Sequence, residues 1–77
     1  MNNDYSALIG FIYSNEKLVN KVKFAKYLGI SYSALKNKLI GKTPFTQKEI
    51  MKMKVDFSLT PDQVDRYFFT PKLLKGN

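Results

Sequence analysis

The sequence predicts an all-α fold in which five short helices form one small domain. Apolar residues recur at helical spacing, and residues that start or end helices punctuate the chain at short intervals. The 77 residues, 44% of them hydrophobic, suffice for a single core. We therefore assign residues 1–70 to one domain and residues 71–77 to a short C-terminal tail.

The first two helices are predicted from the spacing of their apolar residues. The first covers about residues 4–14, with Asn3 or Asp4 as its N-cap. The polar turn "SNEK" follows, and a second helix covers about residues 21–28. In the first helix, four apolar residues at i, i+3, i+4 and i+7 form one stripe: Tyr5, Leu8, Ile9 and Ile12.

A glycine separates the second helix from the third. Gly29 is expected to end the second helix, because glycine adopts the left-handed conformation without a clash at Cβ. Ser31 then offers an N-cap hydroxyl, and Ile30 with Leu35 forms a hydrophobic staple. The third helix is therefore predicted over about residues 32–40.

The last two helices are predicted from their capping boxes. Gly41 closes the third helix as Gly29 closes the second. Helices over about residues 47–56 and 61–69 follow, and Pro61 suits the first position of the last one. The two boxes are Thr46 with Glu49 and Thr60 with Gln63.

The second and third helices together have the pattern of a helix-turn-helix motif. Two short helices are joined by one glycine turn, and Ala25, four residues before that glycine, is small enough for a close crossing. Each residue alone is also explained as core or turn, whereas their combination in a basic, all-helical chain favours the motif. The apolar residues expected at the crossing are Phe24, Leu28, Ile30 and Leu35.

The outward face of the third helix is the candidate for contacts with DNA bases. At roughly 100° per residue, Tyr32, Ser33, Lys36 and Asn37 share one arc. The Asn37 amide suits adenine and the Lys36 ammonium suits guanine. An ordinary solvated helix face is the alternative. Candidate phosphate contacts around this face are Lys21, Lys38, Lys42 and Thr43.

The net charge of +7 is concentrated in the middle of the chain. Residues 31–54 carry six lysines against Glu49, a net of +5, whereas residues 55–71 carry Arg66 against three aspartates, a net of −2. A basic middle favours a polyanionic partner such as double-stranded DNA, although lysines on solvated helices give the same composition.

The inventory of reactive side chains argues against catalysis. Histidine and cysteine are absent, which removes the commonest general base, the best soft nucleophile and the usual zinc ligands. We therefore expect no enzyme, no catalytic residue, no metal and no cofactor. The lack of cysteine suits a reducing cytosol. No apolar run approaches the roughly 20 residues that cross a bilayer, so we expect no membrane partner.

The run "FAKYLGISYSALKNKLIGKTPFTQKEI" with the later "LTPDQVDRYFF" resembles the small phage regulators of the lambda-repressor-like class, of Cro or XRE type. The resemblance covers about residues 4–70. It implies a compact five-helix lambda-repressor-like domain in the cytoplasm of a bacterial host, often as a dimer. It also implies operator binding through Ser33, Lys36 and Asn37, and a role in the lysis or lysogeny decision.

Two functions follow as hypotheses. The first is a Cro-like transcriptional repressor that places its third helix in the major groove of operator DNA. The alternative is an antirepressor or modulator that binds the main phage repressor protein, because the third helix is poor in Arg and Gln. Homodimerisation is a third explanation for surplus apolar residues near the C-terminus. The candidate protein interface comprises Asp62, Asp65, Phe69, Leu73 and Leu74.

Overall fold

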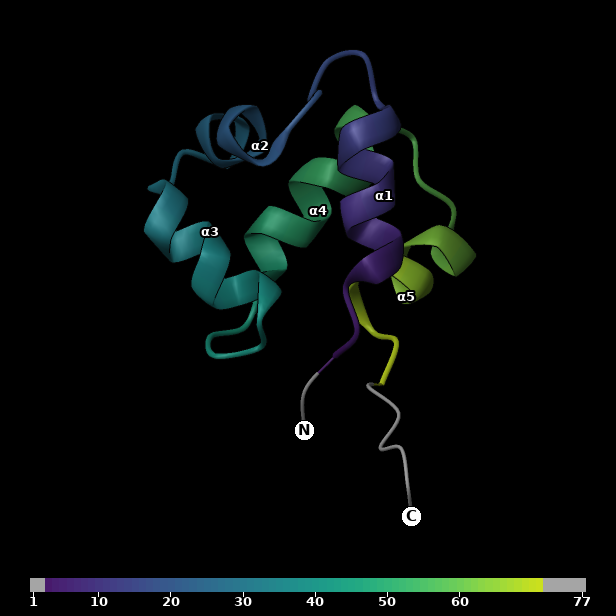
Figure 1. Cartoon of the computed structure of the whole chain (residues 1–77). Coiled ribbons are helices and arrows are strands. Elements are labelled where there is room, and N and C mark those ends of the chain that lie inside the picture. Colours follow the sequence, from purple (N-terminus) through teal and green to yellow (C-terminus); the bar gives the residue numbers. More distant parts are fainter. Residues whose placement is uncertain (1–2, 72–77) are drawn as a thin grey trace.

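The computed structural model describes residues 3–71, and five α-helices account for most of this part of the chain (Figure 1). None of these helices has the length and apolar character needed to cross a bilayer. The prediction of an all-α fold with five helices is confirmed. The helices are α1 (Ser6–Ser14), α2 (Lys21–Leu28), α3 (Tyr32–Leu39), α4 (Gln47–Asp56) and α5 (Pro61–Phe68).

The two ends of the described chain meet beside α1. The Asp4 N–H donates to the Thr70 carbonyl at 2.6 Å, and Asn3 forms an isolated antiparallel bridge with Pro71. As Figure 1 shows, α1 and α5 lie together, whereas α2 and α3 form a corner at the opposite side of the molecule. This arrangement leaves the outward sides of α3, α4 and α5 open to partners.

Side-chain caps fix where four of the helices begin. The Ser31 hydroxyl accepts the Ala34 N–H at 3.1 Å, as predicted, and both predicted capping boxes are present at the starts of α4 and α5. A further cap at α2 was not predicted: the Asn20 side chain accepts the Lys23 N–H at 2.9 Å. These bonds satisfy backbone donors that helix starts leave free.

The predicted cap of α1 was wrong. The N-cap residue is Tyr5, which makes no side-chain cap bond, because its ring is buried in the core instead. Asp4, one residue earlier, accepts the Ser6 N–H at 2.8 Å and the Ser6 hydroxyl at 2.6 Å. The carboxylate therefore supports the first turn of α1 from just outside the helix.

Gly29 forms the corner between α2 and α3 as predicted. Its φ of 74° and ψ of 29° are left-handed. The Ile30 N–H reaches back to the Ala25 carbonyl at 3.0 Å, which closes the end of α2. Ala25 is only 2% exposed, as a close helix crossing requires. Gly41 after α3 is also left-handed, with φ of 83°.

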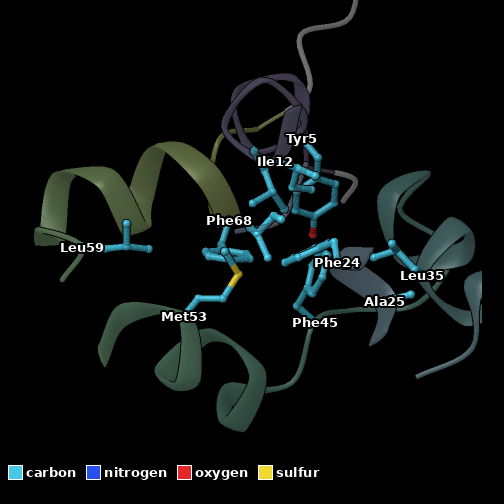
Figure 2. Close-up of a cluster of buried hydrophobic side chains, with 11 residues drawn as sticks. Tyr5, Ile12, Phe24, Ala25, Leu35, Phe45, Met53, Leu59 and Phe68 are labelled. Atoms are coloured by element: carbon cyan, nitrogen blue, oxygen red, sulfur yellow. The ribbon is translucent and has the colours of Figure 1, made fainter. Parts of the chain in front are cut away.

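The core lies where α1, α4 and α5 face the corner of α2 and α3 (Figure 2). Phe45 lies between two other rings, with centroids 5.2 Å from Tyr5 and 5.3 Å from Phe68, both edge-to-face. Such pairs contribute about 0.5–1.5 kcal/mol beyond the area that they bury. The largest fully buried side chains are Phe24, Phe68, Leu8, Ile12, Leu18, Leu35 and Met53.

Candidate functional site

The outward face of α3 carries most of the predicted base-contacting residues. Tyr32, Ser33 and Lys36 are exposed, and the Lys36 ammonium lies 5.8 Å from the centre of the Tyr32 ring. Asn37 is half-buried. Ile40, at the end of the same row, is 67% exposed. The face thus combines one ammonium group with two large apolar side chains, a mixture that suits protein as well as DNA.

The four predicted phosphate contacts do not share one environment. Lys42 and Thr43 are exposed after α3, where their N–H groups donate to the Asn37 carbonyl at 2.8 and 3.3 Å. Lys21 is half-buried at the start of α2. Lys38, by contrast, is buried.

Lys38 lies inside the protein, which argues against the predicted phosphate contact. Its ammonium donates to the Pro44 carbonyl at 2.9 Å, forms an ion pair with Glu49 at 3.1 Å and lies 5.7 Å from the centre of the Phe45 ring. The same Glu49 oxygen accepts the Thr46 N–H at 2.8 Å. Lys38 and Glu49 therefore tie the end of α3 to the start of α4.

A hollow of about 360 Å³ lies beside the end of α3. Ile40 belongs both to this hollow and to the outward row of α3, so the hollow extends that face. The side toward α1 carries polar groups, including the Asp4 carboxylate that accepts the Ser6 bonds. The lining residues are Asn3, Asp4, Tyr5, Ser6, Ile9, Leu39 and Ile40.

A second exposed face runs along α4. Met51 is 49% exposed and Val55 is 70% exposed, and Lys48 and Lys52 on the same helix are exposed as well. At about 100° per residue these four side chains occupy one arc, opposite the buried Met53. The spacing i, i+3, i+4 and i+7 of these four residues was available in the sequence, because helical periodicity alone places them on one side.

Lys52 belongs to a small cluster that links α2 to α4. The Tyr27 hydroxyl donates to Asp56 at 2.6 Å, and Lys52 pairs with Asp56 at 3.4 Å while lying 4.5 Å from the centre of the Tyr27 ring. Burial, together with the hydrogen bond and charge of Asp56, raises the pKa of Tyr27 well above its usual range. The bond from Tyr27, helped by Lys52, lowers the pKa of the exposed Asp56 carboxyl.

The third exposed face belongs to α5 and is net negative, whereas the chain as a whole is net positive. Asp62 and Asp65 are exposed, and Phe69, at the end of the helix, is 54% exposed. Their spacing of i, i+3 and i+7 places all three on one side, together with Arg66. Of the predicted interface, Leu73 and Leu74 lie outside the described residues, as does most of the predicted tail.

Residues 3–71 contain no group of three or more acidic, histidine or cysteine side chains that could hold a metal ion. Every buried side-chain nitrogen or oxygen in this range has a hydrogen-bond partner.

Comparisons with known proteins point to phage regulation. A family model described as "Protein of unknown function (DUF739)" matches residues 1–71. The chain is 34% identical to the modulator of repression (MOR) of the temperate bacteriophage TP901-1 from Lactococcus lactis, whose solution structure it matches with a TM-score of 0.70. The match covers 96% of this chain and 97% of that one. No curated protein is significantly similar to the chain.

Proposed function

This chain belongs to the DUF739 family, and we propose that it is a phage regulator that modulates repression by binding the repressor protein of the switch. The resemblance to a phage modulator of repression, along nearly the whole of both chains, supports this function over that of a Cro-like repressor. On this proposal the protein acts in the cytoplasm of the bacterial host and catalyses no reaction.

The exposed face of α5 is the observation that carries the proposal. Asp62 and Asp65 present two carboxylates, against the single guanidinium of Arg66, on the same side as the exposed ring of Phe69, whereas the net charge of the chain is +7. A repressor must present a basic surface to DNA, because phosphate contacts supply much of its affinity. A net acidic face with an exposed aromatic side chain at its end is complementary to such a surface, since aromatic anchors dominate many protein interfaces.

Occupation of that basic surface explains how repression would be modulated. A repressor whose DNA-contacting side is covered by α5 has no free surface for operator phosphates. Opposite charges at the contact itself attract each other most strongly at low salt. We therefore expect binding of the repressor to weaken as salt concentration rises.

Operator binding through α3 is the second candidate function. It is favoured by the corner at Gly29, which holds α3 against α2 with Tyr32, Ser33 and Lys36 exposed. In this function Lys21, Lys42 and Thr43 contact phosphates, and Asn37 must turn outward to contact a base.

Two titrations separate the candidates. Labelled operator DNA and labelled repressor of the same phage switch are each titrated with the purified chain, with fluorescence anisotropy as the signal. The proposal predicts that the repressor binds, and that Asp65→Lys weakens this binding by about tenfold or more, because like charges then face each other. The control Glu16→Lys makes the same charge change in the exposed turn after α1, and we expect an effect within about twofold.

The DNA titration decides the alternative. Binding of operator without any repressor, lost in Lys36→Ala but retained in the control Lys23→Ala on α2, would support the Cro-like function. The absence of a complex with the repressor at any salt concentration would refute the proposed function.

A further inference from the structure

The exposed face of α4 has no cover within the described chain. Val55 is 70% exposed and Met51 is 49% exposed, and the two lie side by side one turn apart. Lys48 and Lys52 are exposed on the same side of α4. Two apolar side chains beside two ammonium groups fit a partner that offers carboxylates around an apolar group.

The α5 face of a second copy has this chemistry. From N- to C-terminus, α4 presents Lys48, Lys52 and Val55, whereas α5 presents Asp62, Asp65 and Phe69. In each series two charged residues are followed by an apolar one, and the first and last residues are seven positions apart, which is about 10.5 Å at roughly 1.5 Å per residue. We propose that the chain self-associates by packing the α4 face of one copy in parallel against the α5 face of another.

The positions around each helix agree with this register. When two parallel helices face each other, the left flank of one meets the right flank of the other. At about 100° per residue, Lys52 then faces Asp65, and Met51 faces the aliphatic part of Arg66. Lys48 faces Asp62 in the central row. An antiparallel alignment would instead place Lys48 against Phe69, so the parallel register is the complementary one.

Lys52 enters this contact already oriented. Its ammonium is held by Asp56 at 3.4 Å and by the ring of Tyr27, which restricts the freedom of a long side chain before association. Lys48 has no such partner among the residues described. Charge reversal at Lys48 therefore tests the contact without disturbing the cluster of Tyr27 and Asp56.

Self-association through α5 has a regulatory consequence. The contact covers the face of Asp62, Asp65 and Phe69 that is proposed to meet the repressor. A copy whose α5 face is covered in this way cannot bind the repressor, so the fraction of α5 faces free for the repressor falls as the concentration of the chain rises. This consequence alone depends on the proposed function, whereas the self-association does not.

Sedimentation velocity of the purified chain, with no repressor present, tests the contact. We expect the mass to rise from one chain to two or more with concentration, and the rise to be weaker at high salt. Lys48→Asp and Asp62→Lys should each weaken association by about tenfold, because each places like charges opposite each other. The double variant Lys48→Asp/Asp62→Lys restores opposite charges between copies and should recover most of the loss.

A matched control is Lys23→Asp on α2, which changes the same charge outside both faces and should associate as the unaltered chain does. Circular dichroism establishes that each variant keeps its helices. A chain that sediments as a monomer at all concentrations overturns the proposal, and so does a double variant that associates no better than the single ones.

Discussion

The ammonium group of Lys38 is satisfied inside the protein by Pro44 and Glu49. Removing it leaves the Glu49 carboxylate, 14% exposed, without its cation. Because a largely buried charge without a partner is costly, we expect Lys38→Met to lower the free energy of unfolding by about 2 kcal/mol in urea denaturation. Methionine retains most of the aliphatic packing, so the loss reports the charge.

Lys36→Met is the control for this substitution. Lys36 lies two residues earlier on the exposed side of α3, and its loss should change the free energy of unfolding by less than about 0.5 kcal/mol. Equal effects of the two substitutions would show that the ion pair of Lys38 does not stabilise the fold.

The hydrogen bond from Tyr27 should be visible in the titration of Asp56. The pKa of Asp56 lies below its ordinary value of 3.8, first because of this bond and then because of Lys52. We expect Tyr27→Phe to raise the pKa of Asp56 toward that value in an NMR titration of the side-chain carboxyl. An unchanged titration in the variant would contradict the assignment of the cause.

The sign of the accompanying stability change follows from the lowered pKa. Because the folded state lowers the pKa of Asp56, the ionised carboxyl stabilises the protein at pH values above its unfolded-state pKa of about 3.9. This stabilisation is lost as the pH falls through the folded-state pKa. The difference in unfolding free energy between the original chain and Tyr27→Phe should therefore be larger at pH 6 than at pH 2.

Substitutions at two glycines test where the chain needs a left-handed backbone. Gly29 has a positive φ of 74°, so Gly29→Ala should destabilise the protein by about 1 kcal/mol although an added Cβ meets no atom within 4 Å. Gly10 lies within α1, where an added Cβ also meets nothing within 4 Å. Gly10→Ala should therefore stabilise the protein by about 0.5–1 kcal/mol.

Thermal unfolding of the two variants measures both effects. The opposite signs distinguish a requirement for left-handed backbone from a general effect of adding a methyl group. A stabilising Gly29→Ala would mean that the corner between α2 and α3 does not need a left-handed residue.

At the scale of the element, local signals were enough to predict the helices. Capping boxes and glycine stops depend on residues within one turn of each other, so the starts of α4 and α5 followed directly from the sequence. The start of α1 did not, because burial of Tyr5 in the core decides it. Local sequence signals do not report tertiary packing, so they cannot predict a helix start that packing decides.

The candidate surfaces were likewise predicted only as far as local signals allow. The exposed positions of Tyr32, Lys36, Asp62 and Asp65 follow from helical periodicity. The burial of Lys38 could not be predicted in this way, because it depends on a loop carbonyl and on a carboxylate eleven residues away. Lysine is rarely buried, which is why Lys38 was predicted to lie on the surface.

At the scale of the whole molecule, stability rests on few large side chains. Phe24 is fully buried where α2 meets the core, and Phe24→Ala should cost about 3–5 kcal/mol. A domain of this size is stable by only about 4–12 kcal/mol in total, so the substitution should remove a large fraction of the free energy of unfolding. Calorimetry of Val22→Ala, where the side chain is 53% exposed, should show little change.

The separation of charge over the molecule underlies the proposed function. The basic middle of the chain repels other basic proteins, yet α5 offers them an acidic, aromatic face. An NMR titration of the isotopically labelled chain with the repressor tests this claim most directly. We predict that the largest shifts fall on the amides of residues 62–69. Shifts concentrated on residues 32–37, or no shifts at all, would contradict the account.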